Sequence, residues 1–136
     1  MRRYFVDAWF FIALLDRFDG DHLAARRLES LFVGADLVTH DGVFTELLAY
    51  LSEYGPTIRR SAAEYVRDAM RTITVIPANR PLFLLGLALY ERRPDKEYSL
   101  VDCMSMELMR QHGITHVLTN DHHFRQEGFT VLSDAP

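Results

Sequence analysis

The sequence predicts a single three-layer α/β/α domain in which a mostly parallel sheet is covered by helices on both faces. The chain has 136 residues, of which 49% are hydrophobic and 25% charged, and this is the size and balance of one globular domain with a substantial core. Segments of strand and helix character alternate along the chain, which is typical of parallel sheets with right-handed helical crossovers. No internal repeat or low-complexity segment interrupts the sequence. One domain over residues 1–136 is therefore expected.

In the first half of the chain, strands are expected where short β-rich runs occur, and helices where apolar residues repeat every three or four positions. Gly34 ends the second expected helix, and Gly55 followed by Pro56 ends the third. The expected elements are a strand over 2–6, helices over 9–15 and 21–33, a strand over 36–39, and helices over 41–54 and 57–71.

The second half continues the alternation. A β-branched run stops at Pro77, and Gly113 closes the longest of the later helices. The expected elements are a strand over 72–76, a helix over 81–91, a charged loop over 92–97, a helix over 99–112, a strand over 115–118, a short helix over 120–126 and a strand over 129–132. In a parallel sheet of this kind, ligands bind beyond the carboxyl ends of the strands.

Composition limits the class of protein. The single cysteine, Cys103, excludes an intramolecular disulfide and a Cys-rich zinc site, so a reducing, cytoplasmic location is expected. Asp7 interrupts the apolar run near the amino terminus and no small-residue cleavage site follows, which argues against a signal peptide. No stretch approaches the roughly 20 apolar residues of a membrane-spanning helix, so no membrane partner is expected.

Four acidic residues are predicted to meet at one edge of the sheet. Asp7 follows the first strand and Asp121 follows a later one, and the carboxyl ends of parallel strands lie at the same edge. Asp102 lies in the first turn of its helix, where the helix dipole favours a carboxylate. Glu46 lies on the flank of an apolar helix stripe, from which a long side chain can reach inward.

Converging carboxylates repel one another unless a cation neutralises them, and clusters of hard oxygen ligands suit Mg²⁺ or Mn²⁺. We therefore expect Asp7, Glu46, Asp102 and Asp121 to be both metal ligands and catalytic residues. The net charge of −4 argues weakly against a nucleic-acid partner. With these four set aside, however, the remaining acidic residues balance the 15 Lys and Arg.

Each acidic residue has a simpler interpretation when it is taken alone. Asp7 and Asp121 could cap the helices that follow them, because Asp is common at such joints. Ser99 and Asp102 have the spacing of a capping box, and Glu46 could be a solvated edge residue.

The joint pattern is more specific than its members. It consists of Tyr-Phe-Val-Asp at 4–7, a helical Glu within 43–48, Ser-Leu-Val-Asp at 99–102, and Leu-Thr-Asn-Asp-His-His-Phe at 118–124. In this order the four motifs resemble those of the PIN-domain nucleases, the fold of many VapC-type toxins of toxin–antitoxin pairs. The resemblance extends over nearly the whole chain. One departure is that Ala8 and Trp9 follow Asp7, where the family commonly has a small hydroxyl residue.

The resemblance implies a metal-dependent endoribonuclease that hydrolyses RNA phosphodiester bonds through a metal-activated water, with one or two Mg²⁺ or Mn²⁺ ions per site. It also implies that the protein is the toxin of a toxin–antitoxin system, forms a homodimer and binds an antitoxin protein. An apolar groove made by the first helices could hold an amphipathic segment of that partner.

Other residues are predicted to support the site. Ser99 is expected to fix Asp102, and Thr119 and Asn120 are expected to orient Asp121. The basic residues Arg92, Arg93 and Lys96, in the loop before the Asp102 helix, are candidate RNA contacts. The other histidines are scattered, and the adjacent His122 and His123 point in different directions on their helix, so a zinc site is not expected and most of the six histidines are expected at the surface.

Two alternatives remain open from the sequence. The chain could be a catalytically silent PIN-like scaffold that binds RNA or protein, or a metal phosphatase acting on small phosphoesters. Two other enzyme classes are excluded, because there is neither a Gly-x-Ser-x-Gly elbow nor a Gly-rich phosphate-binding loop.

Overall fold

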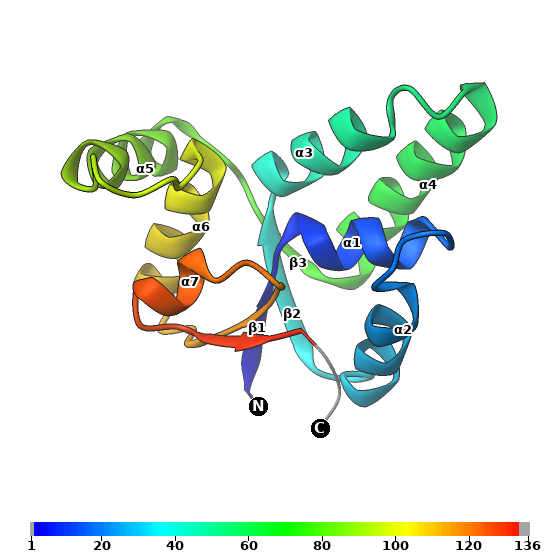
Figure 1. Cartoon of the computed structure of the whole chain (residues 1–136), viewed down its shortest axis with the longest axis horizontal. Helices are drawn as coiled ribbons and strands as arrows, with labels where there is room; N and C mark the ends of the chain where they lie inside the picture. The colour runs from blue at the N-terminus through cyan, green and yellow to red at the C-terminus, as the bar shows by residue number, and fades with distance from the viewer. Residues whose placement is uncertain (1, 134–136) are drawn as a thin grey trace.

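A five-stranded parallel sheet lies at the centre of the computed structural model, which describes residues 2–133 (Figure 1). The strands run in the order β3-β2-β1-β4-β5, and every neighbouring pair is parallel. Their bounds are β1 Arg3–Val6, β2 Asp36–His40, β3 Thr74–Ile76, β4 His116–Leu118 and β5 Thr130–Leu132. The predicted three-layer fold class is confirmed. Residue 1 and residues 134–136 of the expected domain lie outside the described part of the chain.

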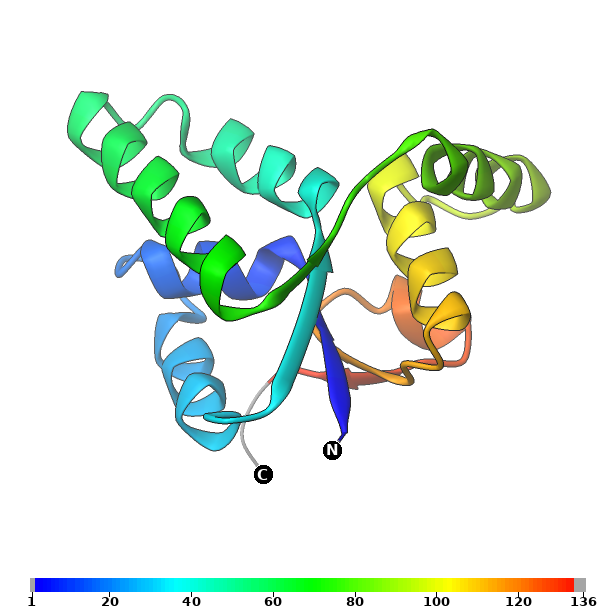
Figure 2. The ribbon, with the colours of Figure 1, turned by 180° about the vertical axis from the view of Figure 1, so that it is seen from behind.

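Helices cover both faces of the sheet. The bounds are α1 Ala8–Leu15, α2 His22–Leu31, α3 Asp41–Leu51, α4 Pro56–Thr72, α5 Arg80–Arg92, α6 Leu100–Gln111 and α7 His123–Gln126. Figures 1 and 2 show α1 to α4 on one side of the sheet and α5 to α7 on the other. Within residues 2–133, none of these helices combines the length and the apolar character needed to cross a membrane.

Every expected element is present, and the largest differences lie at two helix ends. The helix expected over 41–54 ends at Leu51, and the helix expected over 120–126 begins only at His123. The second difference has a local cause. The Thr119 hydroxyl accepts a hydrogen bond from the Asp121 backbone N–H at 3.1 Å, and Asp121 Oδ1 accepts one from the His123 N–H at 2.9 Å. Side chains thereby hold this segment in a turn instead of a helix.

The central strand β1 and helix α6 form much of the core. Phe5 and Val6 of β1 are fully buried, and so are Met106 and Met109 of α6. Helix α5 packs closely on α6 at Gly86, where an added Cβ would lie only 3.0 Å from the backbone nitrogen of Met104. The helix that contains Asp102 is therefore held between the sheet and α5.

The sheet register brings the ends of three strands together. Val6 is paired with Leu118, and the Asp7 N–H donates to the Leu118 carbonyl at 3.2 Å. His40, which ends β2, is fully buried, and its Nδ1 accepts from the Gly42 N–H at the start of α3. Its Nε2 lies 2.9 Å from the Ser105 hydroxyl of α6. One imidazole therefore joins the helix that contains Glu46 to the helix that contains Asp102.

Candidate metal centre

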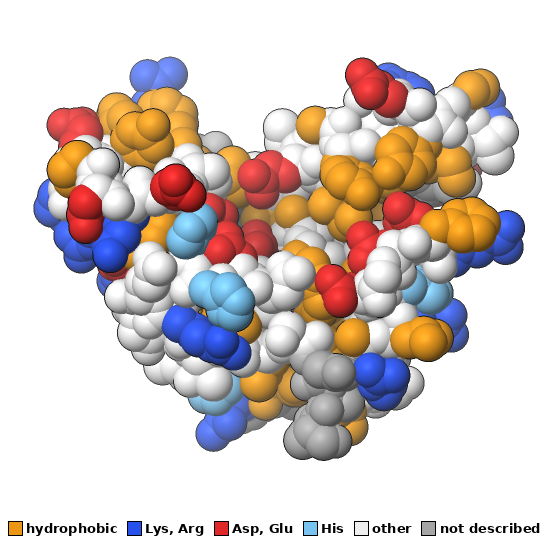
Figure 3. All heavy atoms as spheres, viewed as in Figure 1, with side chains coloured by type: hydrophobic (Ala, Val, Ile, Leu, Met, Phe, Trp, Pro, Cys, Tyr) orange, Lys and Arg blue, Asp and Glu red, His pale blue; other side chains and the backbone are white. Residues whose placement is uncertain are grey.

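An open cavity of about 700 Å³ lies at the carboxyl ends of the strands. Figure 3 shows acidic side chains gathered in the hollow between the two halves of the molecule. All four predicted acidic residues, Asp7, Glu46, Asp102 and Asp121, line this cavity, although they come from four separate parts of the chain. The structure therefore brings together the set that the sequence singles out.

Asp7 is the most deeply buried of the four, with an exposed fraction of 6%. It occupies the position before α1 but makes no side-chain capping hydrogen bond there. Its Oδ2 instead accepts from the buried Thr119 hydroxyl at 2.8 Å. Burial, followed by the negative charge of Asp102, raises the pKa of Asp7 from 3.8 to about 7, against the lowering effect of the Thr119 bond. The helix-capping interpretation of Asp7 is therefore wrong.

Asp102 is part of a capping box at the start of α6. Its Oδ2 accepts from the Ser99 N–H at 3.1 Å, and the Ser99 hydroxyl accepts from the Asp102 N–H at 3.0 Å. The side chain is only 13% exposed, and burial is the main cause that raises its pKa. The capping interpretation thus holds for Asp102, yet the same carboxylate lines the cavity. Capping fixes its orientation.

Glu46 comes from the opposite side of the cavity, in the second turn of α3. Its pKa is raised from 4.5 to about 7, mainly by burial and then by the charges of Asp102 and Asp121. The side chain is half-buried in the lining of the cavity, so it is not a solvated edge residue. Glu46 therefore belongs to the acidic cluster.

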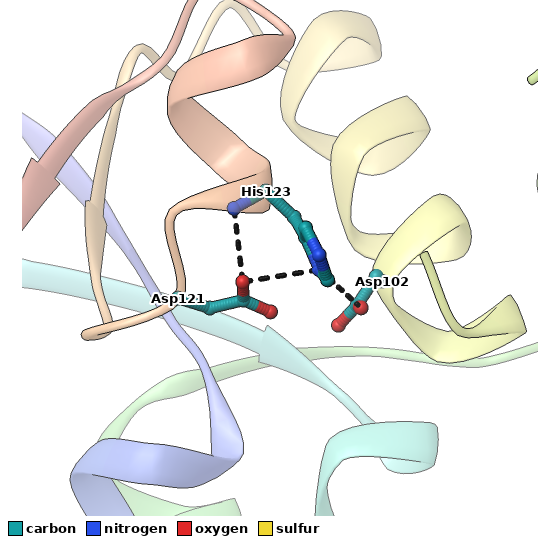
Figure 4. A group of neighbouring side chains, drawn as sticks. All are labelled: Asp102, Asp121 and His123. Carbon is teal, nitrogen blue, oxygen red and sulfur yellow. Dashed lines mark hydrogen bonds and ion pairs between the residues drawn. The ribbon is translucent and has the colours of Figure 1, made fainter. Parts of the chain in front are cut away.

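His123 is a member of the site that the sequence does not single out. Its Nδ1 lies 3.1 Å from Asp121 Oδ1 and 3.9 Å from Asp102 Oδ2, as Figure 4 shows. This nitrogen is buried and has no hydrogen-bond partner among residues 2–133. His123 is half-buried because the segment before it forms a turn and its ring lines the cavity. The sequence feature that points to His123 as a site residue is its position two residues after Asp121.

The residues present fit a divalent metal. Potential ligand atoms of Asp102, Asp121 and His123 all lie within 4.8 Å of one another. Asp7 and Glu46 add carboxylates to the same cavity, and burial raises the pKa of both. A cation would relieve the repulsion among these groups, and the His123 nitrogen, which makes no hydrogen bond with residues 2–133, could be a further ligand. Most of these donors are hard oxygens, the ligands that Mg²⁺ and Mn²⁺ prefer.

The predicted supporting residues lie beside the acids. Thr119 is fully buried and bonds both Asp7 and the Asp121 backbone. The Asn120 amide donates to Asp21 Oδ2 at 3.4 Å, and the Trp9 indole N–H donates to the same oxygen at 3.0 Å. Ser99 lines the cavity as the partner of Asp102.

The predicted RNA contacts lie outside the lining of this cavity. Arg93 binds the carboxylate of Glu127 through two nitrogens, at 2.9 and 3.3 Å. Arg92 lies 3.8 Å from Glu107, and Lys96 lies 3.7 Å from Asp95. A role for these three residues in RNA binding stays a prediction.

Comparison with known proteins gives one family match. A family model described as PIN domain matches residues 4–129. No curated protein matches this chain.

Several solved structures are similar. The VapC20 toxin of Mycobacterium tuberculosis, described as cleaving the sarcin-ricin loop, has 28% identity and a TM-score of 0.80, over 93% of this chain and 96% of that one. FitAcB from Neisseria gonorrhoeae has 17% identity and a TM-score of 0.68, over 95% and 96%. A toxin–antitoxin complex from Klebsiella pneumoniae has 14% identity and a TM-score of 0.62, over 94% of each chain. The last two likenesses concern the fold alone.

Proposed function

We propose that this chain, which belongs to the PIN domain family, is a metal-dependent endoribonuclease and the toxin of a toxin–antitoxin pair. The observation that supports the proposal most strongly is the meeting of Asp7, Glu46, Asp102 and Asp121 in one cavity, beside His123. The similarity to VapC20, a toxin described as cleaving the sarcin-ricin loop, supports RNA as the substrate.

In this proposal, Asp102, Asp121 and His123 hold a metal from one side of the cavity, and Asp7 and Glu46 complete its surroundings. One or two Mg²⁺ or Mn²⁺ ions held by these residues would supply polarisation of the scissile phosphate and acidification of a water molecule. The Thr119 hydroxyl fixes Asp7, and the Ser99 cap fixes Asp102, so neither carboxylate has to be ordered when substrate arrives.

We assign Glu46 the further role of accepting a proton from the attacking water. Its carboxylate lines the cavity in which the scissile phosphate would lie, within reach of a water molecule bound there. Its position on α3 also separates it from the tighter group formed by Asp102, Asp121 and His123.

We further infer that a protein antitoxin binds this chain. The support is by analogy: one structure with the same fold is described as a toxin–antitoxin complex.

The first test is cleavage of RNA by the purified protein in Mn²⁺, with and without a chelator. The Asp102→Asn variant should lose about a hundredfold or more of the activity, because it removes a charged metal ligand. Asp95→Asn is the matched control, since Asp95 is exposed and lies outside the cavity. Equal cleavage by Asp102→Asn and the unmodified protein would show that the metal site is wrongly assigned.

Two further measurements separate the alternatives. If calorimetry detects no binding of Mn²⁺ and the RNA assay detects no cleavage, the protein is a silent scaffold. Activity on nitrophenyl phosphate without activity on RNA would favour a phosphatase.

Expression in bacteria tests the toxin role. Induced expression of the unmodified protein should slow growth, expression of Asp102→Asn should not, and a cognate antitoxin should restore growth. Unimpaired growth would count against the toxin role alone.

A further inference from the structure

We propose that the α1 side of the cavity is a nucleobase-binding subsite, in which the indole ring of Trp9 stacks on an unpaired RNA base beside the cleaved phosphate. The inference rests on the proposed ribonuclease function and adds to it the kind of nucleotide that the site takes. Trp9 lies in the first turn of α1, two positions after Asp7, and its side chain lines the same cavity as the acids.

The ring of Trp9 is held in place by the protein. Its indole N–H donates to Asp21 Oδ2 at 3.0 Å, and the Asn120 amide donates to the same oxygen at 3.4 Å. Because the only polar group of the ring is already bonded, what Trp9 offers to the cavity is aromatic surface. A ring fixed in advance loses little conformational entropy when it binds a ligand.

The chemistry of this wall favours a base over a phosphate. Ile12 and Tyr50 line the cavity together with Trp9, so an apolar and aromatic surface adjoins the acidic cluster. Asp19 lines the same cavity, and its negative charge, like that of Asp21 at the indole N–H, repels phosphate groups. A neutral, planar base meets no such repulsion and can stack on the indole.

This arrangement also indicates which RNA can be cut. A base stacks on a protein side chain only when it is free of its own helix, as in single strands, loops and bulges. The subsite therefore selects an unpaired nucleotide next to the scissile bond.

Tryptophan fluorescence tests the proposal directly, since Trp9 is the single tryptophan of the chain. The probes are a short single-stranded oligoadenylate and a ribose-phosphate oligomer of the same length without bases, both titrated with Ca²⁺ in place of Mn²⁺ to limit cleavage. We expect saturable quenching by oligoadenylate and none by the base-free oligomer. Equal quenching by the two would overturn the proposal.

Substitutions then separate stacking from packing. Trp9→Leu should weaken oligoadenylate binding, measured by anisotropy of a labelled probe, by about tenfold or more, while Trp9→Phe should stay within about threefold. Phe18→Leu is the matched control, because Phe18 is an exposed aromatic residue outside the cavity lining. Calorimetry with Mn²⁺ checks that the acidic cluster is intact in each variant. Unchanged binding by Trp9→Leu would also overturn the proposal.

The outcomes distinguish this subsite from the proposed function. Base-dependent quenching without RNA cleavage in Mn²⁺ would leave the subsite standing and refute the nuclease. RNA cleavage without base-dependent quenching would refute the subsite and leave the nuclease standing. The comparison of the two probes on the unmodified protein decides the question even if Trp9→Leu fails to fold.

Discussion

At the scale of single residues, the site is a set of carboxylates held in an unfavourable environment. Asp7 is almost fully buried, accepts one side-chain hydrogen bond from Thr119, and lies near the charges of Asp102 and Glu46. In the metal-free protein, ionisation of Asp7 is therefore less favourable in the folded state than in the unfolded chain. This difference is removed when a cation binds.

This gives a prediction for the metal-free protein. The pKa of Asp7 rises from 3.8 to about 7 on folding, so the folded state binds more protons between these values and its stability falls as the pH rises through that range. The Asp7→Asn variant cannot ionise at this position, so it should not lose stability in this way. Its free energy of unfolding should match that of the unmodified protein near pH 4 and exceed it by about 2 to 4 kcal/mol near pH 8.

Urea unfolding in a chelating buffer at several pH values measures this difference, and taking the difference cancels the contribution of other groups such as His40. Asp95→Asn serves as the control for the removal of one carboxylate, because Asp95 is exposed and lies outside the cavity. Adding Mn²⁺ near pH 8 should stabilise the unmodified protein more than Asp7→Asn. A stability difference that stays constant with pH would contradict the burial argument.

At the scale of helices and strands, two contacts hold the cavity in shape. His40 bonds the start of α3 and the Ser105 hydroxyl of α6, and burial lowers the pKa of this imidazole to about 4, so it stays neutral at physiological pH. Gly86 allows α5 to lie directly against α6. Both contacts determine where the Asp102 helix sits relative to the sheet.

The close approach of α5 and α6 yields a second prediction. Gly86→Ala should destabilise the protein by about 1 kcal/mol or more, because overpacking against Met104 outweighs the roughly 1 kcal/mol that Ala gains in helix propensity. The midpoint of thermal unfolding measures the effect. Gly20→Ala is the matched control, since nothing lies within 4 Å of its added Cβ and Gly20 has no positive φ. A Gly86→Ala variant at least as stable as the unmodified protein would refute the close packing.

At the scale of the whole molecule, large apolar side chains remain exposed on α5. Phe83, Leu84 and Tyr90 are 39%, 52% and 52% exposed, and Figure 3 shows hydrophobic atoms grouped over this helix. Contiguous apolar surface of this kind marks interaction sites in many proteins. We propose that this face of α5 is the contact between two copies in the homodimer that the family resemblance implies.

Light scattering or sedimentation tests the dimer. The unmodified protein should have twice the mass of one chain, and Leu84→Glu should shift it toward the monomer, because a two-fold interface receives the added charge from both copies. Leu23→Glu is the control, since Leu23 is 70% exposed on α2 and lies outside this face. A monomeric unmodified protein would rule out the dimer, whereas a dimer unaffected by Leu84→Glu would place the contact elsewhere.

Much of this molecule follows from the sequence alone. The apolar periodicity and the Gly and Pro residues at segment ends predict, in order, the twelve elements found in residues 2–133. Their alternation predicts the parallel sheet. The meeting of Asp7 and Asp121 follows too, since the carboxyl ends of parallel strands lie at one edge, whereas Asp102 and Glu46 are predicted from their places on two helices.

Only the tertiary structure decided which side chains meet. His123 enters the cavity because a turn held by Thr119 and Asp121 precedes it, and Arg93 is engaged by Glu127, which lies 34 positions away. Trp9 gains its partner Asp21 across the α1–α2 connection. The pairings of Arg93 with Glu127 and of Trp9 with Asp21 depend on long-range packing. A pattern of residue types determines the face on which a side chain lies, but the partner across that face exists only once the chain has folded.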